Sequence, residues 1–394
     1  MALWAMGYRF NPNNCIIDFP STEYFITMLP SSSGCLTIDL AAIQANWHQV
    51  AATLKHADCA AVVKANAYGV GDCEVAGALY KAGCRAFFLA TLEEAAKLRL
   101  MLPDDSKLFV LGGARQGAEN EFWKSNLIPV LFTLEDIDRW EAFCLSRREL
   151  LPCAIKLDTG MSRFGLSGSD INKLIASIPQ RAWLNPILLM SHLACADEPH
   201  HPLNQRQLER FRVAAASIKM FFPSVKLSLA NSSGVFLGDE YHFDMVRVGA
   251  ALYGINPQPS ALNSLRNVLG LKLPVLQIRI TEASVRVGYG ADGQAEAATR
   301  LAVVAGGYAD GLHRTLGPRP KGKIEGVTVF VVGRISMDSM VFDISALADN
   351  PQYIEVINNE LTLDYLMTEN RLLGYELLTG LGARFQRQYV GLEC

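Results

Sequence analysis

The sequence has no excess of charge of either sign. Its 36 Lys and Arg residues are balanced by 39 Asp and Glu residues, which leaves a formal net charge of −3 over 394 residues. A chain without a basic excess has no electrostatic footprint for a nucleic-acid backbone, so we expect no nucleic-acid partner. Global disorder is excluded as well, because 50% of the residues are hydrophobic and only 19% are charged.

Patterned cysteines and long apolar runs are also missing. None of the nine cysteines stands in a C-x-x-C spacing. We therefore expect reduced thiols, a cytoplasmic location and no metal site. No run of 18 apolar residues occurs, so no membrane span is predicted. Residues 1–34 have neither a basic start nor an unbroken apolar stretch, and we expect an N-terminal extension outside the core that is not a signal peptide.

Short apolar runs alternate with helical stretches over residues 35–268. Continuous apolar character is typical of parallel strands buried on both faces. Eight such runs occur, at 61–64, 86–90, 107–111, 128–132, 153–158, 186–192, 226–230 and 243–248. Eight strand–helix units in this length predict a (β/α)8 barrel of the TIM type. A doubly wound open sheet is the alternative, but no G-x-G-x-x-G motif follows the first run.

The segments between these runs carry helix signals. Thr91 and Glu94 have the T-x-x-E spacing of a capping box, in which each side chain binds the other residue's backbone N–H. Leu134, Ile137 and Trp140 recur at helical spacing further along the chain. Both patterns place helices between the predicted strands.

The pattern changes near residue 269. Four β-rich runs follow, separated by glycine-rich turns, at 274–280, 301–306, 327–332 and 340–344. Only residues 362–370 look helical. We therefore predict an α/β protein in which the barrel, residues 35–268, is followed by a smaller, mostly β C-terminal domain, residues 269–394.

Polar residues are concentrated where the predicted barrel strands end, which is where enzymes of this architecture carry their active sites. Lys64 is the most unusual of them, because it follows three apolar residues of a buried strand. Two interpretations are open. The lysine extends its amine from the strand end to solvent, or the amine has a lowered pKa and forms a Schiff base.

Three further features accompany this lysine. Asn231, Ser232 and Gly234 resemble the start of a helix, which would surround an anion with N–H groups and hydroxyls, unless they form an ordinary cap. Arg247 is a second cation in an apolar strand, with an internal ion pair as the alternative role. His192 is either functional or a hydrogen-bonded core histidine. A lysine, an anion cradle and a buried arginine together point to pyridoxal phosphate.

Eight motifs contain these residues. In the barrel they read VVKANAYGVG at 62–71, KLDTGMSRFG at 156–165, HLACADE at 192–198, ANSS at 230–233 and RVGAALYG at 247–254. The second domain adds GYG at 288–290, GYADG at 307–311 and GRISMD at 333–338. Their order and spacing resemble the alanine racemase family, a group of fold-type III pyridoxal-phosphate enzymes. The resemblance covers about residues 36–394 and leaves the first 34 residues without a counterpart.

The resemblance implies a binding site for pyridoxal 5'-phosphate. Lys64 would hold the cofactor covalently. Arg247 would face the pyridine nitrogen, and because an arginine keeps its proton, the ring would stay neutral and be a weaker electron sink. The other implied cofactor contacts are Tyr68, His192, Asn231, Ser232, Gly249, Ala250 and Tyr375.

The resemblance also implies two catalytic bases, one on each face of the substrate α-carbon. Lys64 would take the proton of the D enantiomer. Tyr289 would take that of the L enantiomer, and it would come from the partner subunit of a homodimer.

Substrate contacts are implied in the same way. Arg163 would bind the carboxylate and would be steadied by a carbamylated lysine at Lys156, for which an ion pair with Asp158 is the alternative. Met337 of the partner subunit would complete the carboxylate site. Tyr308, with Tyr375, would narrow the entrance.

These implications predict an enzyme that interconverts L-alanine and D-alanine and supplies D-alanine for bacterial peptidoglycan. A racemase of broader or different specificity, for example for serine, is the nearest alternative, because one methyl or hydroxyl group changes binding by only about 1–3 kcal/mol. A fold-type III decarboxylase would carry a glycine-rich phosphate loop and a cysteine-centred C-terminal motif, and this sequence shows neither. A non-catalytic carrier of the cofactor would consist of the barrel alone. Ser336 stands where many relatives have Cys or Ala, and we expect a small effect on the pocket.

Overall fold

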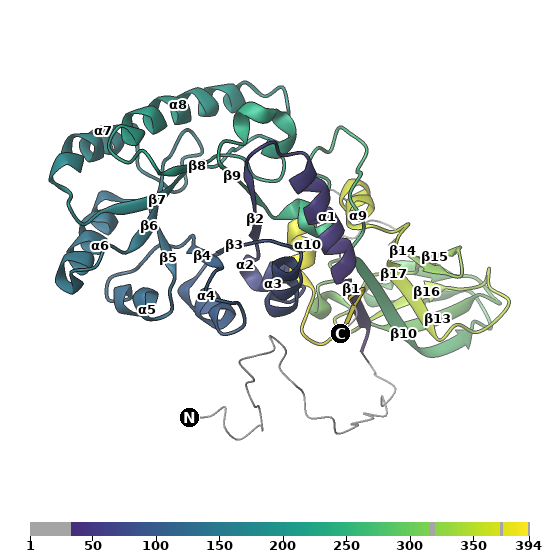
Figure 1. Ribbon diagram of the computed structural model, residues 1–394. Coiled ribbons are helices and arrows are strands. Elements are labelled where there is room, and N and C mark those ends of the chain that lie inside the picture. Colours follow the sequence, from purple (N-terminus) through teal and green to yellow (C-terminus); the bar gives the residue numbers. More distant parts are fainter. Residues whose placement is uncertain (1–32, 315–319, 371–372, 393–394) are drawn as a thin grey trace, which may run out of the picture. The chain divides into compact units, whose positions relative to one another are not determined.

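Eight parallel strands form one sheet in the computed structural model, which describes residues 33–314, 320–370 and 373–392. The strand order is β8-β7-β6-β5-β4-β3-β2-β9 (Figure 1). Backbone hydrogen bonds from Asp244 to Leu227 and from Arg247 to Ala230 join β9 to β8 and close the barrel. The predicted (β/α)8 barrel is confirmed, and the open sheet is wrong. The strands are β2 Asp58–Val62, β3 Ala86–Leu89, β4 Lys107–Val110, β5 Ile128–Leu131, β6 Pro152–Lys156, β7 Asn185–Met190, β8 Lys226–Ser228 and β9 Met245–Val248.

Helices connect these strands and surround them (Figure 1). Side-chain caps set where several begin: Thr133 Oγ1 accepts the Asp136 N–H at the start of α6, and Ser167 Oγ accepts the Asp170 N–H at the start of α7. The predicted apolar face of α6 is buried, including Trp140. The helices are α1 Leu40–Ala52, α2 Lys64–Tyr68, α3 Asp72–Lys81, α4 Leu92–Arg99, α5 Glu119–Lys124, α6 Leu134–Arg147, α7 Gly168–Ser177 and α8 Pro202–Lys219.

The barrel interior is packed with apolar side chains. Phe88 and Phe109 stack there with their ring centroids 4.6 Å apart, among buried residues of neighbouring strands such as Val130 and Leu188. A larger apolar layer lies between the strands and the helices. Burying each such side chain stabilises the fold by about 1.5–3 kcal/mol. The strand ends are thereby held rigidly enough to position functional side chains.

The C-terminal strands form a second eight-stranded sheet, in the order β13-β16-β15-β14-β17-β10-β1-β18. Its first member by sequence, β1, precedes the barrel and pairs with β10 and β18. Residues 35–39 were predicted to belong to the barrel domain, but they form a strand of this second sheet. The boundaries of the two domains, 35–268 and 269–394, stay a prediction. The strands are β1 Cys35–Asp39, β10 Leu269–Ile280, β13 Arg300–Ala305, β14 Lys321–Ile324, β15 Val327–Val331, β16 Ser339–Asp343, β17 Tyr353–Ile357 and β18 Gln386–Val390, with a separate hairpin of β11 Val285–Val287 and β12 Gly293–Ala295.

Two helices accompany this sheet. The predicted helix at 362–370 is present as α9, Leu363–Asn370. The sequence did not predict α10, Gly374–Gly380, which carries Tyr375. The short helix places this tyrosine beside the barrel residue Tyr68, with ring centroids 6.1 Å apart.

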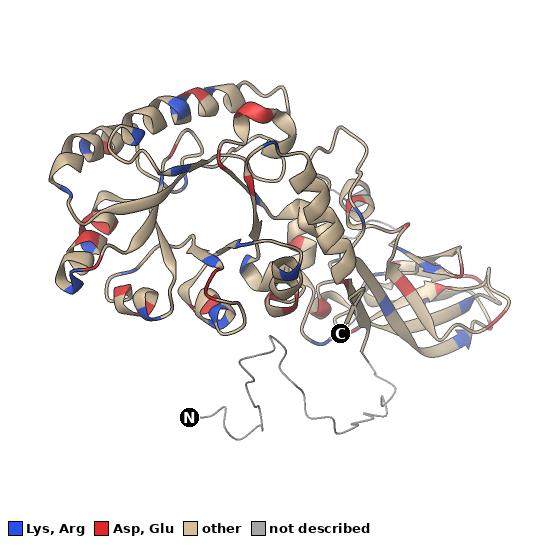
Figure 2. Ribbon diagram, in the orientation of Figure 1, with Lys and Arg blue, Asp and Glu red and all other residues tan. Residues whose placement is uncertain are grey.

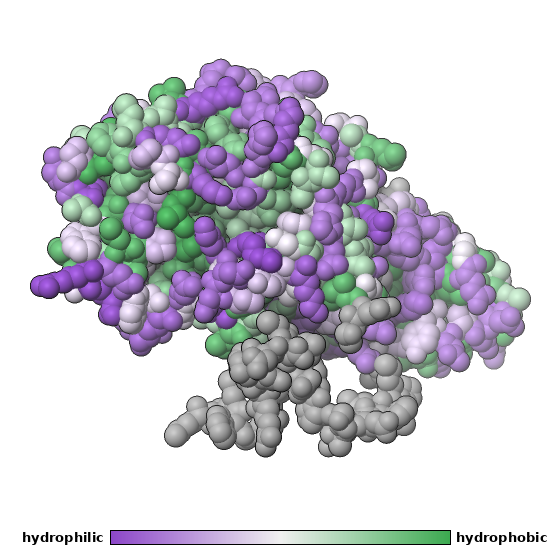
Figure 3. All heavy atoms as spheres, viewed as in Figure 1, coloured by the Kyte–Doolittle hydropathy of each residue, from purple (hydrophilic) through white to green (hydrophobic). Residues whose placement is uncertain are grey.

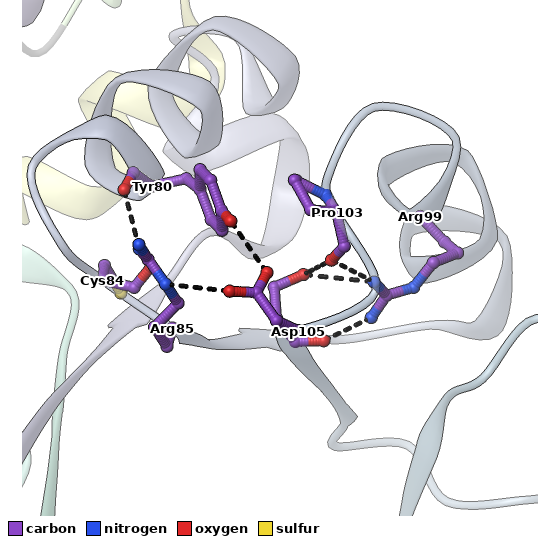
Figure 4. A network of polar contacts seen from close by, with 7 residues as sticks. Tyr80, Cys84, Arg85, Arg99, Pro103 and Asp105 are labelled. Atoms are coloured by element: carbon purple, nitrogen blue, oxygen red, sulfur yellow. Dashed lines mark hydrogen bonds and ion pairs between the residues drawn. The ribbon is translucent and has the colours of Figure 1, made fainter. Parts of the chain in front are cut away.

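Polar contacts fasten the N-terminal ends of β3 and β4. Asp105 accepts a hydrogen bond of 2.8 Å from Tyr80 Oη and forms an ion pair with Arg85 (Figure 4). Arg99 donates to the carbonyls of Pro103 and Ser106 in the same loop. These ends lie opposite to the ends that carry the predicted site, so we assign the cluster a structural role.

The surface agrees with the balanced composition. Lys and Arg lie interspersed with Asp and Glu over the barrel helices and the C-terminal strands (Figure 2). On the face seen in Figure 3, hydrophobic residues occur in small groups between hydrophilic ones. None of the described helices has the length and apolar character needed to cross a membrane. Cysteines in the described segments, for example Cys59 and Cys84, are free thiols. Most of the predicted N-terminal extension, residues 1–32, lies outside the described residues.

Candidate active site

A cavity of about 590 Å³ brings the predicted barrel residues together at the C-terminal ends of the strands. Its apolar wall comes from Val62, Phe88, Leu111, Met190 and Leu373. Its polar lining contains Lys64, Tyr68, Lys156, Arg163, His192, Asn231, Ser232, Ser233, Arg247, Tyr375, Glu376 and Thr379, with Gly249 and Ala250 beside them. Residues from eight separate segments of the chain thus line one space.

Positive charge dominates this lining. Among the described residues that line the cavity, one side chain is a carboxylate, that of Glu376. Four are cationic: Lys64, Lys156, Arg163 and Arg247. Burial and the neighbouring Arg163 lower the pKa of Lys64. Burial and the nearby cations lower the pKa of Lys156 to about 8. The cavity therefore suits an anionic ligand, and the Lys64 amine faces it rather than extending to solvent from the barrel.

Lys64 begins a left-handed turn. The strand ends at Val62, and residues 65–68 then have φ values of 53°, 55°, 51° and 57°. A left-handed conformation costs about 1–2 kcal/mol for each non-glycine residue, and such strain clusters at functional sites. The turn brings Tyr68 against Tyr253, with ring centroids 4.7 Å apart. The predicted strand 61–64 was therefore two residues too long.

The segment after β8 forms a tighter structure than the predicted helix start. A 3-10 helix of four residues, Gly234–Leu237, follows, and Asn231 Oδ1 accepts the Gly234 N–H at 2.9 Å. Ser232 Oγ accepts the N–H groups of Gly249 and Ala251, at 2.9 and 3.3 Å. The serine hydroxyl therefore links the ends of β8 and β9, and its own hydrogen remains to be donated.

Gly249 leaves a space that a side chain would fill. A Cβ atom at this position would lie 2.5 Å from Tyr68 Oη and 3.1 Å from its Cζ. The close approach of Tyr68 therefore makes the requirement for glycine a steric one. Tyr68, Ser232 and Gly249 thus shape one end of the cavity as a polar cradle. The hydroxyls of Tyr68 and Ser232 are its donors, and they fit a phosphate group.

We predict that Gly249→Ala weakens binding of pyridoxal phosphate at least tenfold, because the added methyl group displaces the packed Tyr68 ring. Titration of cofactor-free protein with pyridoxal phosphate, followed by absorbance, measures the change. Gly77→Ala in α3 is the matched control, since a Cβ there meets nothing within 4 Å. The control should bind normally and gain about 0.5–1 kcal/mol of stability. Equal affinity of Gly249→Ala and wild type would contradict the cradle.

Arg247 is a buried cation that pairs with no carboxylate among the residues that the structure describes. Its guanidinium donates to Ser228 Oγ, to the carbonyls of Ser191 and Leu229, and to His192 Nδ1 at 3.3 Å. The alternative of an internal ion pair is therefore wrong. Burial lowers the pKa of Arg247 to about 10, which still leaves it protonated at neutral pH.

His192 is neutral in this arrangement. Its Nδ1 accepts from Arg247, so we assign the ring proton to Nε2. Burial, and then the positive charge of Arg247, hold the pKa of His192 well below its usual range. Arg247 therefore presents a permanent positive charge to the cavity, and neither Arg247 nor His192 titrates near neutral pH.

Asp158 does not pair with Lys156. Its Oδ1 accepts three backbone N–H groups, those of Gly160, Met161 and Ser162. The Lys156 amine lies 5.4 Å from the centroid of the Phe164 ring. The carboxylate therefore organises the loop that leads to Arg163, and the alternative ion pair is not formed.

Three predicted residues lie outside this cavity, on the C-terminal domain. Tyr289, Tyr308 and Met337 are 66%, 38% and 52% exposed. Backbone hydrogen bonds from Tyr308 to Ser336 and from Ala309 to Met337 hold two of their loops together. The cavity of one chain thus contains the predicted lysine base without the predicted tyrosine base.

Sequence reasoning missed several contributors. Phe88, Leu111 and Met190 shape the apolar wall, but apolar residues at strand ends cannot be told from core residues by pattern. Tyr253 supports Tyr68 and donates to the Val62 carbonyl, and its place in the RVGAALYG motif was the available signal. Glu94 was interpreted only as part of a capping box.

Family models match nearly all of the described chain. The model of the alanine racemase N-terminal domain matches residues 38–257, and that of the C-terminal domain matches residues 268–389. The chain belongs to the alanine racemase family. The resemblance inferred from the motifs is thereby confirmed.

Individual alanine racemases agree with this assignment. The chain is 44% identical to the alanine racemase of Rhodospirillum rubrum, over 92% of this chain and 97% of the relative. It is 40% identical to the catabolic alanine racemase of Agrobacterium fabrum, over 91% and 92%. A crystal structure of the Bartonella henselae alanine racemase with covalently bound pyridoxal phosphate superimposes with a TM-score of 0.84 at 37% identity, over 91% of this chain and 99% of that one. The Streptomyces coelicolor alanine racemase gives a TM-score of 0.87 at 29% identity, over 92% and 99%.

Proposed function

We propose that this protein is a pyridoxal-phosphate-dependent racemase that interconverts L-alanine and D-alanine. The observation that carries the proposal is the cavity in which Lys64 faces the polar cradle of Tyr68, Ser232 and Gly249. The covalently bound cofactor of the Bartonella henselae relative supports it. When bound, pyridoxal phosphate withdraws electrons from the substrate α-carbon and so acidifies its C–H bond.

The cavity residues divide the work of holding the cofactor. The Lys64 amine would bond to it covalently. The cradle, with the Ala250 backbone and Tyr375, would bind the phosphate, and Arg247 would face the pyridine nitrogen, backed by His192. Asn231 would hold the loop that presents Ser232, as its hydrogen bond to Gly234 does here.

Two groups would move the substrate proton. The lowered pKa of Lys64 leaves a larger fraction of its amine neutral, as a base requires, and we assign this amine to the α-proton of D-alanine. Tyr289 would take the α-proton of L-alanine on the opposite face. Arg163 would bind the substrate carboxylate together with the Met337 backbone, and Tyr308 would narrow the entrance.

A homodimer would bring these groups together. Inversion needs a base on each face of the α-carbon, but the cavity of one chain is lined by Lys64 and not by Tyr289. Tyr289 and Met337 are instead exposed on the C-terminal domain, where a second subunit can meet them. We further propose a cytoplasmic location and a role in supplying D-alanine for peptidoglycan.

Lys156 would act as a carbamate. Carbon dioxide adds to a neutral amine: the C–N bond forms as one C=O π bond breaks, and the nitrogen releases a proton to solvent. The pKa of about 8 makes the neutral form of Lys156 accessible near neutral pH. The product is an anion among cations, which would offset the repulsion between Lys156 and Arg163 and orient the guanidinium toward the substrate.

We predict that Lys156→Met stabilises the cofactor-free protein by roughly 1–3 kcal/mol at pH 7 in buffer free of carbon dioxide, because it removes a buried cation. Below pH 8 the folded and unfolded states both carry this proton, so the full cost of the charge is present. As the pH rises from 8 toward 10.5, the folded state loses the proton first and the advantage of the variant shrinks. Urea unfolding between pH 7 and 9.5 measures this.

Bicarbonate should then raise the free energy of unfolding of the wild type and leave that of Lys156→Met unchanged. Lys173→Met is the control, because the Lys173 side chain is 67% exposed and its removal should change stability by less than about 0.5 kcal/mol. A bicarbonate effect of equal size in wild type and Lys156→Met would exclude carbamylation at this lysine.

Incubation of the purified protein with L-alanine in deuterated water tests the function. We expect D-alanine to form and the α-position to gain deuterium. The absence of both would overturn the proposal. The same assay with serine ranks the alternative substrate.

A further inference from the structure

The Glu94 carboxylate accepts two hydrogen bonds that its capping-box motif does not predict. They connect two separate parts of the barrel. Thr91 Oγ1 accepts the Glu94 N–H at 3.3 Å, as a capping box requires. The Glu94 carboxylate completes no such box, since Oε2 accepts the N–H of Ala90 at 2.8 Å and Oε1 accepts the N–H of Ala65 at 2.9 Å. One carboxylate thus spans from the end of β3 to the residue that follows Lys64.

The Ala65 N–H has a special position. It belongs to the peptide unit that joins Lys64 to Ala65, so its direction constrains the ψ angle of Lys64 and the φ angle of Ala65. The orientation of the Lys64 Cα–Cβ bond, from which the side chain starts, depends on this peptide unit. Ala65 is also the first of four consecutive residues in the left-handed conformation. Such a turn persists only where its surroundings hold it, and Glu94 supplies a charge-assisted hydrogen bond at its start.

The rest of the turn is held from other directions. Asn66 Oδ1 accepts the Asp72 N–H at 3.0 Å, and Arg387 donates to the Gly69 carbonyl at 3.0 Å. Both bonds act after the turn has begun. Glu94 therefore holds the peptide unit adjacent to Lys64, while the others hold the far end.

The charged groups around Lys64 also support a role for Glu94. Arg163, Lys156 and His192 line the same cavity as Lys64. Burial, and then the positive charge of Arg163, disfavour the protonated form of the Lys64 amine. Among the charged groups in the described part of the chain, Glu94 is the one that raises the pKa of the Lys64 amine. Its carboxylate thus limits how far the lysine pKa falls.

We propose that Glu94 is a positioning residue, whose carboxylate holds the left-handed turn at Ala65 and so directs the Lys64 amine into the cavity. This inference rests on the proposed function, because Lys64 is the group that is directed. Nothing in it requires Glu94 to touch the substrate or the cofactor.

Two variants test the proposal in the full-length protein. Glu94→Ala removes both acceptors. Glu94→Gln keeps one acceptor and the size of the side chain, so it preserves the fold even where the alanine variant does not. Glu93→Gln is the matched control: it removes the same charge from the neighbouring position of α4, where the side chain is exposed.

The readout is the rate at which cofactor-free protein attaches pyridoxal phosphate to Lys64, followed by absorbance over a range of pH. We expect Glu94→Gln to attach it at least tenfold more slowly at the best pH, because a misdirected amine loses the advantage of its orientation. The midpoint of the pH profile should also move to lower pH, since the charge that favours the protonated amine is gone. Glu93→Gln should match wild type within about twofold.

Thermal unfolding separates positioning from stability. If Glu94→Gln unfolds at a lower temperature but attaches the cofactor at the wild-type rate and with the wild-type pH profile, Glu94 is a cap and the inference is wrong. If wild type itself attaches no pyridoxal phosphate through Lys64, the proposed function fails instead. The two failures are therefore distinguishable.

Discussion

Lys64→Ala should abolish racemisation, with a loss of at least about 10⁴-fold, and should prevent covalent attachment of pyridoxal phosphate. The substitution removes the group that holds the cofactor and one of the two bases at once. Lys156 cannot replace Lys64, because it extends into the cavity from the end of β6 and not from the end of β2. Its pKa is lowered there by burial and by neighbouring cations. Turnover of L- and D-alanine and the absorbance of the protein measure the two losses.

Lys81→Ala serves as the control for this prediction. Lys81 lies in the last turn of α3, exposed and remote from the cavity lining, so its removal should leave both readouts unchanged. Lys64→Ala protein that still racemises alanine at more than about one-hundredth of the wild-type rate would contradict the assignment of both roles to one amine.

Tyr289→Phe should separate the two directions of the reaction. The phenol oxygen is the only part of the side chain that can accept a proton, and phenylalanine keeps the ring. We expect L-alanine turnover to fall by at least about 10³-fold while pyridoxal phosphate stays bound. In deuterated water, D-alanine should still exchange its α-proton through Lys64 without inversion, and L-alanine should not exchange.

Tyr353→Phe is the matched control. It removes the same hydroxyl from an exposed tyrosine of the C-terminal domain, on β17, and should be fully active. Racemisation by Tyr289→Phe at the wild-type rate, or exchange of L-alanine as fast as D-alanine, would show that Tyr289 is not the second base.

Mixed dimers test where Tyr289 acts. If each site combines Lys64 of one subunit with Tyr289 of its partner, a dimer of Lys64→Ala and Tyr289→Phe subunits retains one intact site. Random mixing of the two inactive proteins should then restore about a quarter of the wild-type activity, because half the dimers are mixed and half their sites are intact. No recovery after confirmed subunit exchange would place both bases in one chain.

The barrel was predictable because its signal is local. Most residues in each of the eight runs are apolar, and the spacing of the runs leaves room for a helix between them. The local pattern therefore indicates parallel strands covered on both faces. No local pattern predicted where β1 pairs, because Cys35–Asp39 forms hydrogen bonds with β10 and β18, which lie more than 200 residues later. The left-handed turn at 65–68 was equally unpredictable, since Ala and Tyr rarely adopt this conformation and only the surrounding contacts impose it on them.

The candidate site likewise combines features that the sequence predicts with features that it does not. The identity of its polar residues is local information: Lys64 after an apolar strand and Arg247 within one are costly to bury and therefore conspicuous, and the motifs around them indicate the family. Their partners are not local. That Arg247 faces Ser228 and His192 instead of a carboxylate, or that Glu94 binds Ala65 instead of closing a capping box, depends on which strand ends meet.

The sequence by itself determined the fold class, the family and the residues that carry charge into the barrel, because apolar periodicity and motif order are properties of neighbouring residues. The tertiary structure alone decided how those residues act. It closes eight strands so that four cations share one cavity, it lowers the pKa of Lys64 and Lys156 by burial and mutual repulsion, and it leaves Tyr289 exposed outside that cavity. The physical reason is distance: electrostatic and hydrogen-bond energies depend on separations in space, which positions along the chain do not specify.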